Sequence, residues 1–145
     1  MRNKIALCAV TLLAGMGFAR AAGLDPIAIR QVGMDLTGGD LAYIKAVVQA
    51  KGEVKPLEVP AKAIARWAAT IPVLFPPGSE KGGDTKALPE IWSDRAGFEK
   101  IAAAAGAAAT KLADAAKAGD AGVVAVQFKA LGEQCGACHK GYRTK

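Results

Sequence analysis

The clearest hydrophobic pattern in the chain is a stripe near its end, where the core-type positions alternate steps of four and three. The stripe consists of Val124, Phe128, Leu131, Cys135, Cys138 and Tyr142. This spacing is typical of an α-helix that presents one face to a helix bundle. Gly119 ends the preceding helical segment, and Asp120 can cap this one. The pattern therefore predicts a core-facing helix that carries both cysteines on its buried side.

Three further helices are predicted upstream. The first begins at Asp25-Pro26, an N-cap followed by proline in the first turn, and runs to about residue 51. The second runs from about residue 59 to about residue 72, and the third is capped by Ser93 or Asp94 and ends at Gly119. Their core-facing positions are Ile27, Arg30, Met34, Leu41, Ile44, Val48, Ile64, Trp67, Ala68, Ile71, Phe98, Ile101, Ala105, Leu112 and Ala115. With no convincing strand pattern, the fold class is all-α with four helices.

Two glycine-rich stretches interrupt this pattern. Gly38-Gly39 breaks the first helical segment, lowers the local helix propensity and leaves room for a close neighbour. A long connection over residues 76–92 contains Pro76-Pro77-Gly78 and Gly82-Gly83-Asp84. A loop of that length in a small domain usually packs on something or serves a function.

The first 21 residues have the layout of a secretory signal peptide. Arg2 and Lys4 precede an apolar run over residues 5–18, and Ala19-Arg20-Ala21 resembles a cleavage site. The apolar run is too short for a membrane-spanning helix, although an uncleaved anchor is the alternative. Cleavage leaves residues 22–145, enough for one domain with a modest core. We therefore expect a periplasmic protein whose mature part does not insert into the membrane.

The basic charge of the chain is partly due to this leader. The formal net charge is +6, and removal of the three basic residues Arg2, Lys4 and Arg20 leaves +3. No basic patch interleaved with aromatic residues is present, so the charge is no argument for nucleic-acid binding.

Cys135-Gly-Ala-Cys138-His139 carries the chemistry of the chain. C-x-x-C-H is the attachment pattern of a c-type haem, with two thiols to bond the porphyrin and an adjacent imidazole as the proximal iron ligand. A structural zinc site needs about four ligands, and this motif supplies only three. A thioredoxin-like motif needs a βαβ context, which the sequence does not show. A Cys135–Cys138 disulfide in a haem-free bundle is a further alternative, but it leaves His139 unexplained. We therefore expect one covalent haem c.

The sixth iron position determines the function. His139 is the only histidine, and signal cleavage leaves Met34 as the only methionine. Ligation by Met34 raises the reduction potential and suits electron transfer with redox partner proteins, and this is the first interpretation. The alternative is that Met34 packs as core, which leaves a five-coordinate iron open to small gases such as NO or CO.

Other cavity candidates are charged or aromatic. Arg30 and Arg143 can pair with haem propionates, or they are solvated surface charges. Arg143, four residues past His139, is expected on the same helical face. The aromatic residues Tyr43, Trp67, Phe75 and Trp92 are expected to be packing groups. No second titratable group is paired with the haem, so an enzyme is not expected.

The chain resembles the class II c-type cytochromes, the cytochrome c′ group, over nearly all of residues 22–145. The matching residues are Cys135-Gly-Ala-Cys138-His139-Lys-Gly-Tyr142-Arg143, Pro89-Glu-Ile-Trp92-Ser93-Asp94, Phe75-Pro-Pro-Gly78, and Arg30 with Met34. A haem motif at the C-terminal end is specific, because class I cytochromes c carry theirs near the N-terminus.

The resemblance implies an antiparallel four-helix bundle, of which cytochrome c′ is a known example. It implies haem on the last helix, His139 as proximal ligand with Arg143 near it, and Met34 at the distal position. High-spin members usually carry a bulky apolar residue there, whereas members of the low-spin cytochrome c-556 type use methionine as the sixth ligand. Val73-Leu74 stands where many high-spin members have tryptophan. Members often dimerise through the first two helices, so a homodimer is possible.

Overall fold

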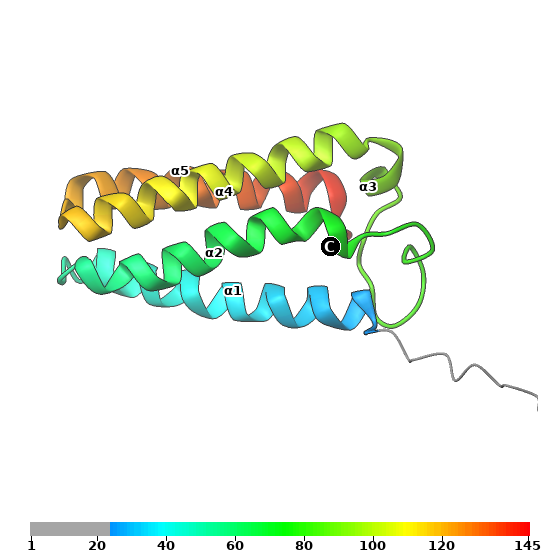
Figure 1. The fold of residues 1–145 in the computed structure, drawn as a ribbon, viewed down its shortest axis with the longest axis horizontal. Helices are drawn as coiled ribbons and strands as arrows, with labels where there is room; N and C mark the ends of the chain where they lie inside the picture. The colour runs from blue at the N-terminus through cyan, green and yellow to red at the C-terminus, as the bar shows by residue number, and fades with distance from the viewer. Residues whose placement is uncertain (1–23) are drawn as a thin grey trace, which may run out of the picture.

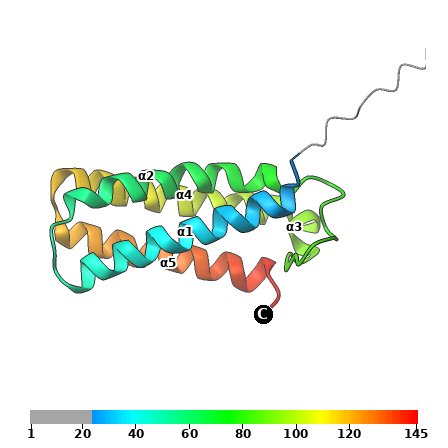
Figure 2. The same ribbon diagram turned by 90° about the horizontal axis from the view of Figure 1, so that it is seen from below.

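Four long helices of the computed structural model form an antiparallel bundle, as the sequence predicts. The structure describes residues 24–145, so the expected signal peptide lies outside the described residues. Figures 1 and 2 show that consecutive long helices run in opposite directions along one elongated bundle. The long helices are α1 (Pro26–Gln49), α2 (Glu58–Thr70), α4 (Arg95–Ala118) and α5 (Ala121–Tyr142).

Short elements connect them. The 3₁₀ turn η1 (Lys55–Leu57) precedes α2, and η2 (Ile71–Leu74) follows it. A one-turn helix, α3 (Glu90–Ser93), ends the long connection before α4. No membrane-spanning candidate occurs among the helices of residues 24–145, because none combines the required length and hydropathy.

Capping residues set the helix ends. The side chains of Asp25, Asp94 and Asp120 accept hydrogen bonds from backbone N–H groups in the first turns of α1, α4 and α5. Gly119 ends α4 with φ of 80°, in the left-handed region that glycine adopts without strain. Three predicted helix starts and one predicted end are thus confirmed by geometry.

The sequence prediction was wrong about Gly38-Gly39, because α1 continues through both glycines without a break. The glycine cost of a fraction of a kcal/mol per residue is smaller than the packing that holds the flanking turns. An added Cβ at either residue would meet nothing within 4 Å. The small residues therefore leave open space beside α1.

Two hydrophobic clusters fill the bundle. The main core lies among α1, η1, α2, α4 and α5, with Ile44, Leu57, Leu112, Val124 and Leu131 almost fully buried. The second, which we call the aromatic cluster, consists of Phe75, Ile91, Phe98 and Tyr142. Small residues let α2 and α4 approach closely, since a Cβ added at Gly106 of α4 would lie 3.5 Å from the Cβ of Ala68 of α2. The aromatic cluster lies at the end of the bundle where the long loop and both cysteines meet.

Candidate haem site

A cavity of about 640 Å³ opens in the bundle beside the aromatic cluster. Its walls come from all four long helices and from residues 84–87 of the loop, and they include Cys135, Cys138 and His139. Met34, Arg30 and Arg143 also line it, so the structure brings together every site residue that the sequence predicts. The volume lies within the range of about 300–1,000 Å³ that small-molecule and cofactor sites occupy.

Cys135 and Cys138 lie one turn apart on α5, half-buried and free. Burial raises the pKa of both thiols, and for Cys138 burial together with the neighbouring Cys135 raises the pKa to about 11. Before haem is attached, both side chains are therefore neutral thiols at pH 7. A neutral thiol is a weak metal ligand and a weak nucleophile, so these cysteines are poorly suited to thiolate redox chemistry.

His139 follows directly on α5 and has an exposed side chain that lines the same cavity. Partial desolvation, and then the positive charge of Arg143, lower the pKa of His139. The imidazole is therefore neutral at pH 7, and a neutral imidazole can coordinate iron through a ring nitrogen. A preference for the neutral form is what a proximal ligand needs.

Met34 faces the cavity from α1, so it approaches from a different wall than the α5 residues. Its side chain is partly buried. The thioether is the one sulfur that α1 and α2 bring to the cavity, and His139 is the only histidine of the chain.

Arg30 is almost fully buried, with 4% of its surface exposed, and its guanidinium group organises the long loop. Nη1 donates to the carbonyl oxygen of Leu74 and to Oγ of Ser79, at 3.3 and 3.1 Å. Nη2 donates to the carbonyl oxygen of Ser79 at 2.9 Å and to Oγ1 of Thr85 at 2.6 Å. The guanidinium carbon also lies 4.3 Å from the ring centroid of Phe75. Four of the five donors of this side chain are thus used by η2 and the loop, and Nε has no partner among the described residues.

Arg143 corrects one prediction. It is not on the same helical face as His139, because α5 ends at Tyr142 and Arg143 has an extended backbone with φ of −136° and ψ of 137°. A β-bridge pairs it with Ala87. The backbone N–H of Leu88 donates to the carbonyl oxygen of Tyr142, and that of Thr144 donates to the carbonyl oxygen of Lys86. These hydrogen bonds join the loop to the last residues of the chain, and Arg143 lines the cavity from this junction.

Trp67 is a cavity residue that the sequence assigns only to packing. Its indole Nε1–H is buried and has no acceptor among the described residues. An unpaired buried donor costs about 1–3 kcal/mol. The loop residues 84–87 were not predicted in the site either, because no periodic pattern marks a loop as a cavity wall.

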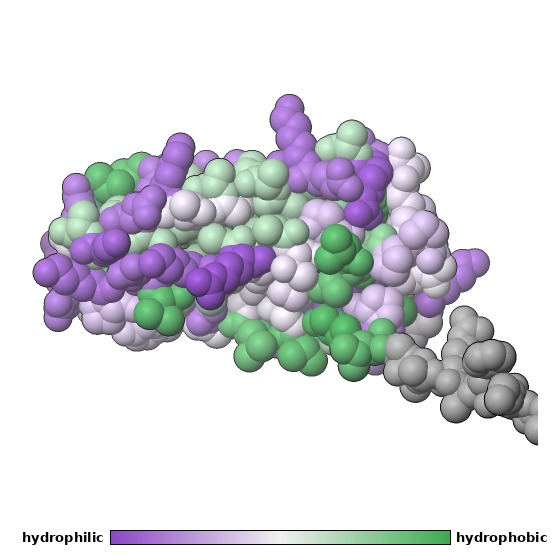
Figure 3. Space-filling view, in the orientation of Figure 1, coloured by the Kyte–Doolittle hydropathy of each residue, from purple (hydrophilic) through white to green (hydrophobic). Residues whose placement is uncertain are grey.

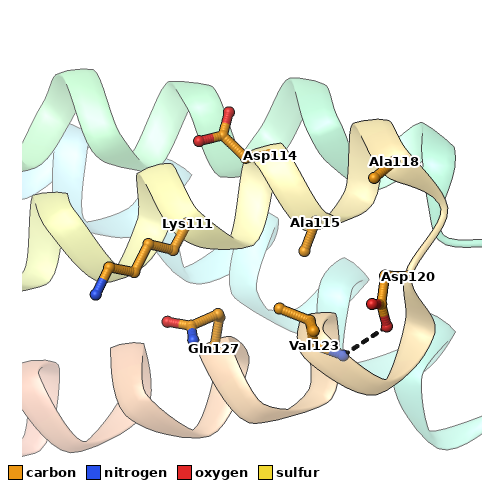
Figure 4. A pocket seen from close by; sticks show the side chains of 7 residues that line it. All are labelled: Lys111, Asp114, Ala115, Ala118, Asp120, Val123 and Gln127. Carbon is orange, nitrogen blue, oxygen red and sulfur yellow. Dashed lines mark hydrogen bonds between the residues drawn. The ribbon is translucent and has the colours of Figure 1, made fainter.

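A second hollow, of about 330 Å³, lies between α4 and α5 at the opposite end of the bundle (Figure 4). Most of its lining side chains are exposed, among them Lys111, Asp114 and Asp120. It contains no cysteine or histidine, and Asp120 uses its carboxylate to cap α5. The hollow is a surface depression without the chemistry of the larger cavity.

The residues of the larger cavity fit a haem. Apolar side chains of α2, η2 and α4 form its inner wall, namely Ile64, Ala68, Ile71, Ile101, Ala102 and Ala105. A flat apolar macrocycle would be buried against this wall, while the thiols and the imidazole of α5 would hold it from one side. Polar residues, including Gln31 and Arg143, line the remaining part, where carboxylates are better accommodated.

Comparisons of the sequence point to one family. A family model described as Cytochrome C′ matches residues 25–143. A cytochrome c′ from Rhodopseudomonas palustris is 37% identical, with 100% of this chain and 99% of that protein covered. A cytochrome c-556 from Agrobacterium tumefaciens is 38% identical, with 77% of this chain and 91% of the relative covered.

Solved structures agree with the sequence relatives. A cytochrome c′ whose structure is described as having an unusual ligand-controlled dimer dissociation superposes with a TM-score of 0.79 at 34% identity, covering 86% of this chain and 100% of that one. A nitric oxide complex of a mutant cytochrome c prime from Alcaligenes xylosoxidans superposes with a TM-score of 0.75 at 31% identity, covering 83% and 94%.

A four-helix bundle that presents two thiols and an imidazole to an apolar cavity defines a c-type haem protein. One haem c is bound covalently through Cys135 and Cys138. The chain belongs to the cytochrome c′ family. Proteins of this family are haem carriers or gas binders and are not enzymes.

Proposed function

We propose that this protein binds small neutral gases, NO or CO, at a five-coordinate haem iron held by His139. One observation carries the proposal: the side chains of α2 that line the cavity are apolar and offer no iron ligand, and α1 offers only the thioether of Met34 and the carboxylate of Asp35. An apolar distal side disfavours water and anions and admits small uncharged molecules. The nitric oxide complex of the similar cytochrome c prime supports the same function.

The bound haem supplies the iron to which the gas binds. Cys135 and Cys138 fix the position of the group along α5, and His139 serves as the proximal ligand. The lowered pKa of His139 keeps the imidazole available at neutral pH. Met34, Ile64 and Ile71 exclude water from the other side. Arg30, through Nε, and Arg143 compensate the charge of the propionates.

The optical and EPR spectra of the purified holoprotein test this function. We expect a high-spin ferric spectrum and, after reduction, a spectrum that shifts when NO or CO is added. Met34→Ala should leave the ferric spectrum high-spin and increase the affinity for CO, because it enlarges the distal space. Sharp low-spin bands in the native protein, with no adduct of either gas, would overturn the proposal.

The second candidate function is electron transfer with His139 and Met34 as the two axial ligands. The observation that favours it is the presence of the Met34 thioether in the cavity wall, together with the cytochrome c-556 relative. Thioether ligation raises the reduction potential, and redox partner proteins would then be the partners. Low-spin bands that disappear in Met34→Ala would establish this function.

The proposed place of action is the periplasm. The expected signal peptide over residues 1–21 supports export, after which residues 22–145 form the mature protein. Determination of the N-terminal residue of the mature protein tests both the location and the cleavage site. An N-terminus at residue 22 is expected, and a membrane-bound full-length chain would contradict it.

We also propose that the protein forms a homodimer through α1. Val32, Leu36 and Tyr43 lie at helical spacing on α1 and are 58%, 68% and 49% exposed. Figure 3 shows hydrophobic side chains gathered along the lower edge of the molecule, where α1 runs in Figure 1. A contiguous exposed apolar patch marks an interaction surface. The similar cytochrome c′ described with dimer dissociation supports a second copy as the occupant.

Leu36→Glu tests the dimer. A carboxylate placed at the centre of an apolar interface is desolvated without a partner, so sedimentation velocity should show a monomer where the native protein sediments as a dimer. Val126→Glu on α5, equally exposed in the monomer at 63%, is the matched control and should leave the dimer intact. Monomeric native protein at all concentrations would exclude this interface.

A further inference from the structure

The indole ring of Trp67 is in direct contact with the backbone of α1 at Gly33. A Cβ atom added at Gly33 would lie 2.0 Å from Cη2, 2.3 Å from Cζ2 and 2.4 Å from Cζ3 of the ring. Real Cβ atoms do not come this close to other atoms, so no other residue fits at position 33 unless the ring moves. Glycine is unfavourable inside a helix, and at this position it provides the space that the ring occupies.

Packing alone fixes the position of this ring. The Nε1–H group of Trp67 is buried and makes no hydrogen bond to the described residues. Trp92, by contrast, donates its indole N–H to the carbonyl oxygen of Pro76 at 3.2 Å. A tryptophan without a polar partner stays where its neighbours exclude other positions, so Gly33 and the adjoining cavity determine where the Trp67 ring lies.

The ring lies beside the distal position of the haem site. Gly33 directly precedes Met34 on α1, and Met34 and Trp67 both line the cavity. The other cavity residues of α2 are Ile64 and Ala68, both smaller than tryptophan. Trp67 is therefore the largest side chain that α2 contributes to the cavity wall.

We propose that Trp67, seated on Gly33, is a specificity-determining residue that limits the size and the entry rate of ligands at the distal side of the haem. The proposal rests on the gas-binding function and deepens it. Steric access to the distal side decides which ligands reach a haem iron. Diatomic gases pass beside Met34, whereas ligands with an alkyl chain meet the indole ring.

Ligand binding to the reduced holoprotein tests this role. The probes are CO and the methyl, ethyl and n-butyl isocyanides, followed by flash photolysis and stopped-flow absorbance. In Trp67→Leu we expect the association rate of CO to rise by about tenfold, which corresponds to an activation free energy lower by about 1.4 kcal/mol. We also expect n-butyl isocyanide to bind to this variant, whereas the native protein excludes it. Trp67→Phe, with a ring of intermediate size, should lie between the two.

Trp92→Leu is the matched control, because Trp92 is of the same size but does not line the cavity. It should leave the association rates of CO and of the methyl and ethyl isocyanides unchanged, and n-butyl isocyanide should still be excluded. Equal rates in the native protein and in folded Trp67→Leu would overturn the proposal. Thermal unfolding and the Soret spectrum of each variant establish that it is folded and loaded with haem.

A double-mutant cycle tests the contact with Gly33. Gly33→Ala should push the indole into the cavity and slow the entry of CO, and Trp67→Leu in the same chain should restore fast entry, because leucine leaves room for the new methyl group. Such dependence between the two sites is the signature of direct contact. Additive effects of the two substitutions would contradict it.

The ligand-binding measurements also distinguish a failure of this inference from a failure of the proposed function. If the native protein forms no adduct with CO or NO, the gas-binding function fails, and the probes are applied to Met34→Ala and to Met34→Ala/Trp67→Leu. Faster entry in the double variant still supports a steric role for Trp67. Equal rates in these two variants overturn the role whatever the native iron binds.

Discussion

The carboxylate of Asp94 caps α4 and also binds the last residue of α5. One carboxylate oxygen accepts a hydrogen bond from the backbone N–H of Gly97 at 3.2 Å, and the other accepts one from the hydroxyl of Tyr142 at 2.7 Å. A Cβ at Gly97 would lie 2.2 Å from Oδ2 of Asp94 and 2.7 Å from the hydroxyl oxygen of Tyr142. The absence of a side chain at Gly97 is therefore what lets α4 and the end of α5 share one carboxylate.

Gly97→Ala should lower the free energy of unfolding by about 1–3 kcal/mol, because it disturbs the cap and overfills a tight contact. Gly132→Ala is the control, since nothing lies within 4 Å of a Cβ at that exposed helical position. It should stabilise the protein by about 0.5–1 kcal/mol. Urea unfolding of both variants measures the difference, and equal effects would exclude the contact at Gly97.

The stability contribution of Tyr142 should depend on pH. The hydrogen bond to Asp94, followed by burial, raises the pKa of Tyr142 from its ordinary value of 10.0 to about 12. A pKa raised by folding stabilises the folded state below the unfolded-state pKa, and the stabilisation disappears as the pH rises through the folded-state pKa. Native protein should thus be more stable than Tyr142→Phe at pH 7–9, and the difference should vanish between about pH 10 and 12. A constant difference over this range in urea unfolding would contradict the assignment.

The sequence predicts most residues of the site because their chemistry is unusual. Cys135, Cys138 and His139 form a motif, and Met34 is the only methionine after expected cleavage. Trp67 could not be assigned in this way, because a tryptophan on a core-facing stripe is usually a packing residue. Its contact with Gly33 depends on the distance between α1 and α2, which no spacing within one helix specifies.

At the scale of elements, the loop of residues 75–89 is held from inside the bundle. Arg30 of α1 directs its guanidinium group to oxygen atoms of Leu74, Ser79 and Thr85. Burial lowers the pKa of Arg30, while Asp25 and Glu80 oppose this effect. A buried cation held by loop oxygens makes one wall of the haem cavity depend on one side chain of α1.

Arg30→Lys should loosen the loop, because an ammonium group cannot reproduce the planar fork of donors. We expect the free energy of unfolding to fall by about 2–4 kcal/mol, and trypsin to cleave after the exposed Lys81 faster than in the native protein. Arg66→Lys, on the exposed face of α2, is the control and should change neither quantity. Unchanged cleavage in Arg30→Lys would show that the loop is held by other contacts.

The helices were predictable from caps and periodicity, whereas the connections were not. Aspartate caps mark α1, α4 and α5, and the apolar spacing gives their buried faces. The turn α3 has four residues, too few for a helical period to appear in the sequence. The β-bridge between Ala87 and Arg143 pairs residues far apart in the chain, so neither local spacing nor propensity indicates it.

For the whole molecule, the haem is part of the core. Apolar side chains form the inner wall of the cavity of about 640 Å³. A haem held there removes this wall from water, which is favourable by roughly 25 cal/mol per Å² of apolar surface. The order of the bundle around the cavity should therefore depend on the cofactor.

Cys135→Ser/Cys138→Ser protein, prepared without haem, should lose fixed structure around the cavity. Hydrogen exchange should show strongly reduced protection in the first half of α1 and in the loop, while α2, α4 and the first half of α5 remain protected by the main core. Added haem can bind to this variant only noncovalently, and it should restore the protection of α1 from hydrogen exchange. Uniform protection in the haem-free protein would contradict a structural role for the cofactor.

The uneven packing of the four helices has a consequence for the order of folding. α4 packs extensively on both α2 and α5, whereas α1 and α5 touch little because the cavity lies between them. Only Gly119 and Asp120 separate α4 from α5, and such local contacts form fastest, while α1 packs less on the other long helices than α4 does. A chain that folds in this order completes the distant half of the bundle while the side holding the two thiols is still open. The late closure of α1 then gives a haem-attaching enzyme a defined period in which it can reach both cysteines.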